Sequence, residues 1–197
     1  MGKGRLEAFS DGVLAIIITI MVLELKVPHG GEITSLKPLL PVFLSYILSF
    51  VYLGIYWNNH HHMLHTVTRM TGGIMWANLH LLFWLSLLPF ATGWLGENRE
   101  SPLPSVLYGL VLLCAGVAYW VLERVIVWSQ GESSMLKRAV GADIKGILSI
   151  LIYALGILLA YSSVIWSNVL YALVACLWII PDRRIERAVP TEGTAVP

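Results

Sequence analysis

An arginine and a short polar triplet stand directly before the first apolar stretch of the chain. Arg5 is followed by Phe9, Ser10 and Asp11, and an uncharged apolar run then extends to Leu23. A carboxylate at the mouth of a membrane helix is costly unless protein groups satisfy it, so it usually has a function. We expect Asp11 to hold this helix in place through hydrogen bonds, and the alternative is that it attracts cations at the inner mouth of a pore.

A histidine cluster is the second group of residues with possible chemistry. His60, His61, His62 and His65 lie within six positions, and a separation of four residues would put His61 and His65 on one helix face. No glutamate lies between them, so the His-Glu-x-x-His pattern of zinc proteases is absent. We interpret the cluster as an interfacial hydrogen-bonding patch, with pH sensing near the ordinary histidine pKa of about 6.5 and metal binding as alternatives. No metal ligand and no cofactor are assigned.

The second and third apolar segments should meet at the cytoplasmic side, at the depth of Asp11. Amide and imidazole groups there would satisfy the carboxylate oxygens of Asp11 and fix the rotation of the first helix. The predicted positioning network consists of Arg5, Phe9, Ser10, Asp11, Asn58, His61, His62 and Asn78, and His60 lies at about the same depth.

The composition is that of an integral membrane protein. Hydrophobic residues make up 57% of the 197 residues and charged residues only 13%, and the mean hydropathy is +0.73. A net charge of +1 gives no field that would attract nucleic acid, so the expected surroundings are a lipid bilayer. Cys114 and Cys176 lie in apolar runs without zinc-ligand spacing, and we interpret both as packing residues.

Six segments are apolar and long enough to cross a hydrocarbon core of roughly 30 Å, which needs about 20 helical residues. Pro89 should kink the third of them. The polar tail 182–197 contains two prolines and is predicted to be a short disordered cytoplasmic tail after a channel domain at 1–181. The predicted segments are 5–26, 38–62, 72–95, 103–128, 144–161 and 164–181.

The basic residues predict the orientation of these segments. With the N-terminus inside, only Lys26, Lys37 and Arg99 fall on the outer side. This positive-inside bias predicts a multi-pass protein of the cell membrane with both termini cytoplasmic. The basic residues on the inner side are Lys3, Arg5, Arg69, Arg124, Lys137, Arg138, Lys145, Arg183, Arg184 and Arg187.

The first segment has two different faces when about 100° is assigned to each residue. Ile16, Thr19, Ile20 and Leu23 form one stripe, which is aliphatic apart from a single hydroxyl. Asp11 lies almost opposite. We therefore expect one face to have a function of its own while the other contacts the rest of the protein.

The sequence resembles the transmembrane protein 175 family, the prokaryotic relatives of the endolysosomal potassium channel. The family signature Arg-x-x-x-Phe-Ser-Asp is matched at residues 5–11, at the cytoplasmic start of the first of six segments. Further matches are Trp57 to His62 in the second segment, and Asn78 with Leu87-Leu88-Pro89-Phe90 in the third. The second half of the chain matches only as three more apolar helices.

The resemblance implies an all-α homotetramer in which four copies of the first helix surround one axial pore. Ile16 would form the principal constriction, Ile20 and Leu23 further layers, and Thr19 a polar layer. The chain lacks the Thr-Val-Gly-Tyr-Gly filter of conventional potassium channels, so we expect modest selectivity for potassium over sodium.

Two other functions are alternatives. One is a proton pathway through the histidines and Asp11. The other is a membrane-embedded metal-dependent hydrolase built on Asp11, His60 to His65 and His80, but no second acid lies deep in an apolar segment to support one. We therefore expect a channel and not an enzyme.

Overall fold

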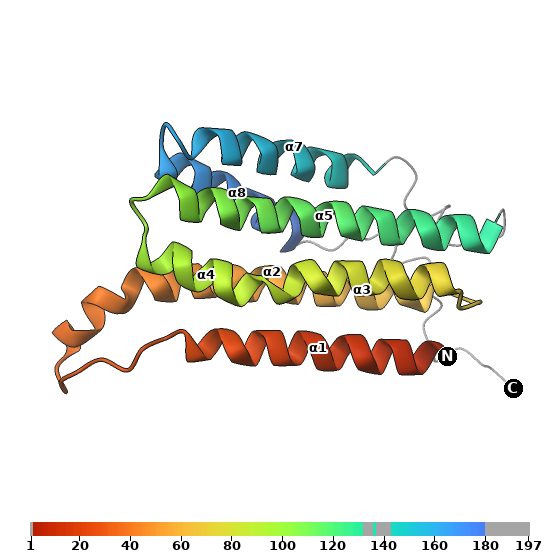
Figure 1. The fold of residues 1–197 in the computed structure, drawn as a ribbon, viewed down its shortest axis with the longest axis horizontal. Helices are drawn as coiled ribbons and strands as arrows, with labels where there is room; N and C mark the ends of the chain where they lie inside the picture. Colours follow the sequence, from red (N-terminus) through yellow and green to blue (C-terminus); the bar gives the residue numbers. More distant parts are fainter. Residues whose placement is uncertain (1, 132–135, 137–142, 180–197) are drawn as a thin grey trace, which may run out of the picture.

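The chain folds into a bundle of α-helices that run side by side (Figure 1). The computed structural model describes residues 2–131, 136 and 143–179. Helix α1 lies at one edge of the bundle, and α7 and α8 lie at the opposite edge. The helical elements are α1 (Lys3–Leu23), the 3-10 helix η1 (Ile33–Leu39), α2 (Leu40–His65), α3 (Gly72–Ser86), α4 (Leu88–Glu97), α5 (Pro102–Gln130), α7 (Ile144–Leu159) and α8 (Val164–Ile179).

These helices confirm the prediction of an all-α membrane protein with six apolar segments. Within the described residues, four stretches are long and apolar enough to cross a membrane, namely Lys3–Leu23, Ile33–His65, Gly72–Glu97 and Pro102–Gln130. The last two helices have 16 residues each, and 16 residues rise only about 24 Å. Helix α7 ends two residues before the end of the predicted segment 144–161, and the described part of the last segment ends at Ile179. Residues 180–181 and the tail 182–197 lie outside the described residues.

The third predicted segment is divided into two helices, as Pro89 indicated. Helix α3 ends at Ser86 and α4 begins at Leu88, with Pro89 in its first turn. Proline has no N–H to donate and its ring displaces the preceding carbonyl, so the helix breaks just before it. The predicted kink is confirmed.

Local sequence signals set several helix ends. The Thr71 side chain accepts a hydrogen bond from the backbone of Ile74 and caps α3, and Asp143 caps α7 by accepting from Gly146 at 2.9 Å. Helix α5 ends where Gly131 adopts φ +65°, a conformation that favours glycine. These ends fix which residues of each helix face the bundle.

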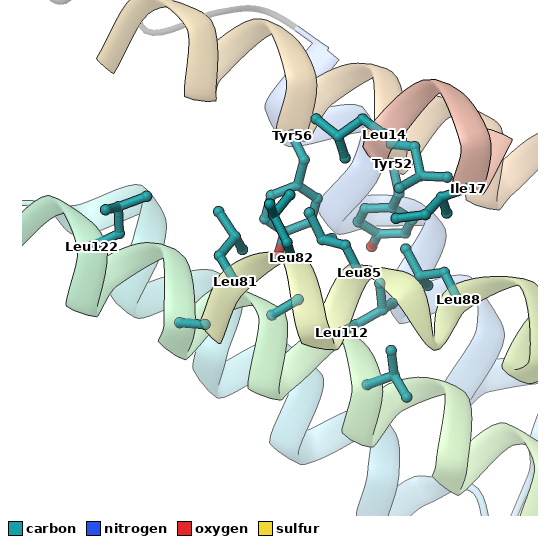
Figure 2. Packing of buried hydrophobic residues seen from close by; sticks show 14 of the residues in the cluster. Leu14, Ile17, Tyr52, Tyr56, Leu81, Leu82, Leu85, Leu88, Leu112 and Leu122 are labelled. Carbon is teal, nitrogen blue, oxygen red and sulfur yellow. The ribbon is translucent and has the colours of Figure 1, made fainter. Parts of the chain in front are cut away.

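The core holds α5 against α3, α4 and α7, while α2 packs on α4 and α8. Buried leucines and tyrosines from these helices meet in the centre, where Leu14 and Ile17 of α1 also reach (Figure 2). Lipid tails are as apolar as leucine, so close packing and internal hydrogen bonds hold membrane helices together. The contacts between helices therefore depend on shape and on buried polar pairs.

Buried hydroxyls supply such polar pairs. Ser49 of α2 lies 2.7 Å from the Thr92 hydroxyl of α4 and 2.9 Å from the Tyr108 hydroxyl of α5. Ser105 of α5 lies 2.9 Å from the Ser167 hydroxyl of α8. These bonds join helices that are far apart in the sequence.

Glycines let α5 and α7 approach the Tyr171 ring of α8. A methyl group at Gly109 would overlap the Tyr171 hydroxyl, and one at Gly156 would overlap the same ring. The Tyr171 hydroxyl donates to the Ser105 carbonyl at 3.2 Å, so the ring has little freedom to move away. The packing of the last two helices therefore requires glycine at both positions.

We predict that Gly109→Ala destabilises the bundle, because overpacking a core costs about 1–3 kcal/mol. The measurement is the thermal unfolding temperature of the purified protein. Gly116→Ala is the matched control, since a methyl group there makes only an ordinary contact, 3.7 Å from Tyr153. Equal unfolding temperatures for the two variants would contradict this explanation of the packing.

Candidate functional site

Helix α1 buries one face and exposes the other. Ile16, Ile20 and Leu23 are 59%, 43% and 77% exposed, and Thr19 is exposed beside them. The predicted stripe is thus a continuous apolar surface with one hydroxyl. The buried residues of the opposite face are Leu6, Ser10, Leu14, Ile17 and Met21.

Phe9 extends the exposed stripe toward the N-terminus. Its ring is 46% exposed, and its position is close to that of Ile16 at about 100° per residue. Arg5 is also exposed, and among the residues that the structure describes no side-chain hydrogen bond or ion pair is recorded for it. Both residues were predicted to position the helix, but here they lie on its open surface.

A chain of buried polar groups holds the other face of α1. Asn78 of α3 donates from Nδ2 to the Ser10 hydroxyl at 2.9 Å, and its Oδ1 lies 2.6 Å from His60 Nε2 of α2. Ser10 in turn donates to the Leu6 carbonyl. Because an amide oxygen can only accept, the proton of this bond must be on His60 Nε2. Exposure of the three side chains is 2% or less.

Asp11 has a different partner from those predicted. It is exposed, and its Oδ1 accepts a hydrogen bond from Trp57 Nε1 at 3.0 Å. Asn58, His61 and His62 are half-buried, and no hydrogen bond from them to Asp11 is recorded in the described part of the chain. An indole N–H therefore satisfies the carboxylate oxygen that was assigned to amides and imidazoles.

The histidine rings pack against one another along α2. His61 and His65 have centroids 4.4 Å apart, and His61 also stacks on Trp57 at 6.2 Å. Across residues 2–131, 136 and 143–179, no three side chains of His, Cys, Asp or Glu are grouped as metal ligands. His80 accepts from Trp84 on the same helix and does not join the cluster.

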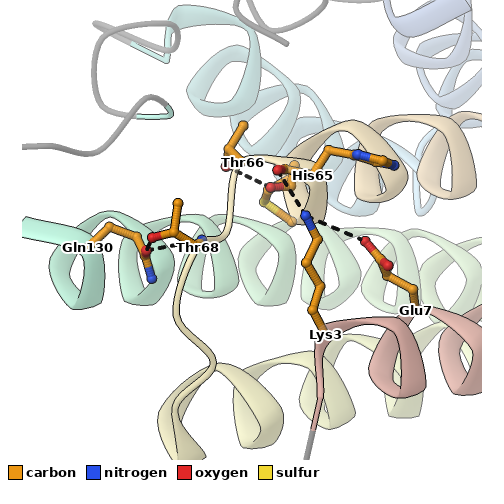
Figure 3. A network of polar contacts seen from close by, with 7 residues as sticks. Lys3, Glu7, His65, Thr66, Thr68 and Gln130 are labelled. Atoms are coloured by element: carbon orange, nitrogen blue, oxygen red, sulfur yellow. Dashed lines mark hydrogen bonds and ion pairs between the residues drawn. The ribbon is translucent and has the colours of Figure 1, made fainter. Parts of the chain in front are cut away.

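Polar contacts at the N-terminal end of α1 tie this helix to its neighbours (Figure 3). Lys3 donates to the His65 carbonyl at 2.9 Å and lies 4.0 Å from Glu7. The Gln130 side chain accepts from the backbone N–H groups of Thr68 and Arg69, both at 3.2 Å. Hydrogen bonds therefore connect the start of α1 to the end of α2, and the end of α5 to the loop that follows α2.

At the C-terminal end of α1, the described residues form an ion pair. Lys26, just after α1, donates to Glu97 at the end of α4 at 2.5 Å. This hydrogen bond raises the pKa of Lys26 above its ordinary value. Between the two helices lies a groove of about 610 Å³, bordered by Ile16 and Ile20 on one side and by Phe90 on the other.

This architecture, with its exposed aliphatic helix face and internally satisfied polar groups, defines a multi-pass α-helical membrane protein. Residues 5–89 match the family model described as endosomal/lysosomal potassium channel TMEM175. A Chryseobacterium sp. (strain P1-3) protein named a potassium channel is 55% identical over 188 residues, which cover 95% of this chain and 98% of that protein. The chain belongs to the TMEM175 family, which consists of ion channels and not enzymes.

Two further relatives bear on the site. A crystal structure of a lysosomal potassium-selective channel TMEM175 homolog from Chamaesiphon minutus superposes with a TM-score of 0.78 and 29% identity, covering 91% of this chain and 97% of that one. A Gallus gallus protein named endosomal/lysosomal proton channel TMEM175 is 35% identical over 113 residues. That match covers 51% of this chain and 23% of the chicken protein.

We predict that Asn78→Leu strongly destabilises the protein, because it leaves Ser10 and His60 buried without their partner. Each unsatisfied polar group costs about 1–3 kcal/mol. Asn58→Leu makes the same chemical change at a half-buried side chain outside the chain of bonds. Thermal unfolding in detergent should give a lower unfolding temperature for Asn78→Leu than for Asn58→Leu. Equal unfolding temperatures would show that the buried hydrogen bonds do not hold α1.

Proposed function

We propose that four copies of this chain form a potassium-selective channel in the cell membrane, with α1 lining the axial pore and both termini in the cytoplasm. The observation that carries the proposal is the exposed stripe of Ile16, Thr19, Ile20 and Leu23 on a helix whose other face is buried. The names of the bacterial relatives and the TM-score of 0.78 to a potassium-selective homolog support it. A face of this kind contacts either lipid or further copies of α1.

Ile16 would form the narrowest ring, with Ile20 and Leu23 as further apolar layers. A narrow aliphatic neck excludes water and so closes to ions until it widens. Among the described residues of the stripe from Ile16 to Leu23 no side chain carries a charge. Conduction would then depend on the width of the neck rather than on a fixed binding site.

Thr19 would supply a polar ring between these layers. Its hydroxyl donates to the Ile16 carbonyl at 2.9 Å, which leaves the oxygen lone pairs available to a passing cation. Four weak oxygen contacts replace only part of an ion's hydration. They favour the ion that loses water more easily, potassium over sodium, so the selectivity should be modest.

The groove between α1 and α4 is consistent with a ring of subunits. A closed ring joins two different surfaces of each subunit in a head-to-tail contact. Ile16 and Ile20 border the groove, so a neighbouring subunit seated in it would lie directly beside the stripe. Phe90, 63% exposed, would then be covered by that neighbour.

We predict that Ile16→Asn increases potassium flux into liposomes and reduces the preference for potassium over sodium. Four amides would keep the neck wet and remove the dewetting barrier. Val22→Asn is the control, because Val22 is an exposed apolar residue of α1 that lies off the stripe. A larger effect at Val22 than at Ile16, in proteins of equal oligomeric state, would exclude the stripe as the pore.

Proton conduction is a second candidate, favoured by the buried bonds from His60 to Ser10 and by the name of the chicken relative. Asn78 interrupts this path, because an amide does not readily accept and release a proton. We therefore expect current to vanish when a large organic cation replaces potassium at neutral pH. A current that persists and follows the pH gradient would favour the proton channel instead.

A further inference from the structure

A cavity of about 50 Å³ lies between α2, α5, α7 and α8, away from α1. A single buried water needs about 10–15 Å³ on this measure, so the cavity has room for several waters or for a small organic group. Neither the pore stripe nor the buried bonds of α1 involve its lining residues. The rings and polar groups of the cavity therefore have no role in the pore or in the positioning of α1.

Aromatic rings make up much of the wall. The rings of Tyr56 of α2 and Tyr119 of α5 meet edge to face, with their centroids 6.1 Å apart. The rings of Trp120, Tyr153 and Trp178 also line the cavity. The faces of such rings carry partial negative charge and attract cations. A cavity lined in this way suits a positively charged group.

Two of these rings already make cation–π contacts with basic side chains of the protein. The Lys145 amine lies 5.8 Å from the Trp178 ring centroid, and the Arg124 guanidinium lies 5.4 Å from that of Trp120. Both distances fall within the range of a cation–π contact. The ring faces near the cavity therefore accept positive charge in this environment.

Two polar side chains of the cavity lining, Asn59 and Asp143, offer hydrogen-bond acceptors. Asn59 is 5% exposed and uses Nδ2 to donate to the Ile55 carbonyl at 2.8 Å, which leaves its Oδ1 to accept. Asp143 uses one carboxylate oxygen to cap α7, and its second oxygen also remains as an acceptor. A group that fills this cavity should therefore donate hydrogen bonds and carry positive charge.

The Tyr56 hydroxyl belongs to a third polar side chain of the cavity lining. Tyr56 is 9% exposed, and within the described part of the chain no hydrogen bond to its hydroxyl is recorded. Buried hydroxyls of tyrosine normally have a partner, because a bare one costs free energy. The Tyr56 hydroxyl oxygen can therefore accept a hydrogen bond from a group in the cavity.

We propose that this cavity binds a small primary ammonium group, with Asp143 and Asn59 accepting its hydrogen bonds and the surrounding rings stabilising its charge. The carrier is either a free alkylamine or the amine headgroup of a membrane lipid. The site is separate from the pore, so its test does not depend on whether the channel conducts potassium.

The test is a titration of propylammonium against the purified protein in phosphatidylcholine nanodiscs. Binding is measured by ligand-observed saturation-transfer NMR. A ligand of four heavy atoms binds at best with a dissociation constant of roughly tens of micromolar, so the titration extends from there to tens of millimolar. The neutral comparison is 1-propanol, which has the same number of heavy atoms. We expect saturable binding of propylammonium and at least tenfold weaker binding of the alcohol.

Two variants locate the binding. Asp143→Asn keeps the helix cap but removes the charge, and should weaken binding about tenfold. Tyr56→Phe removes the unpartnered hydroxyl and should weaken it less. Ile16→Asn, which alters only the pore stripe, should leave the affinity unchanged.

Repeating the titration in nanodiscs that contain phosphatidylethanolamine distinguishes the two sources. Weaker apparent binding there would support occupation by the lipid headgroup, and unchanged binding would support a free amine. The proposal is overturned if propylammonium does not bind saturably, if the alcohol binds equally well, or if folded Asp143→Asn binds as the wild type does. The cavity would then contain only water.

Discussion

The rotation of α1 about its own axis depends on three buried polar side chains. Ser10, Asn78 and His60 have no water to bond in a membrane, so each must find a partner inside the protein. Turning α1 by a single residue, about 100°, would break the bond between Ser10 and Asn78. The same turn would bury part of the apolar stripe, so this chain of bonds decides which face of α1 is left open.

The rest of the bundle serves to hold these groups in position. Helix α3 carries Asn78 and is packed against α5, and the hydroxyls of Ser49, Thr92 and Tyr108 join α2, α4 and α5. Lys3 at the N-terminal end and Lys26 just after the C-terminal end anchor the two ends of α1. A long helix that is held at both ends and by one buried face can present its other face to a pore without bending.

The sequence predicted the helices and the two faces of α1 because both depend on local patterns. Apolar length and 3.6-residue periodicity are visible in a single chain, and Pro89 marked the break between α3 and α4. The hydrogen-bond partners of Ser10 and Asp11 could not be predicted from the sequence in the same way. Ser10 and Asp11 are neighbours that point about 100° apart, and only the packing of α2 and α3 shows that Ser10 is buried while Asp11 bonds to Trp57. The family match at Trp57 to His62 already included Trp57, but the sequence interpretation assigned the partners of Asp11 to the histidines and asparagines instead.

Thiol labelling would show whether the stripe of α1 lines a pore. In a variant with Cys114 and Cys176 replaced by alanine, Leu23→Cys places one thiol on the stripe, and Val22→Cys places it one residue away on a different face. If the stripe lines the pore, a small water-soluble thiol reagent stops potassium flux through the Leu23→Cys channel and leaves the Val22→Cys channel unchanged. Equal inhibition of both channels, or inhibition of the Val22→Cys channel alone, would show that the conduction path lies elsewhere.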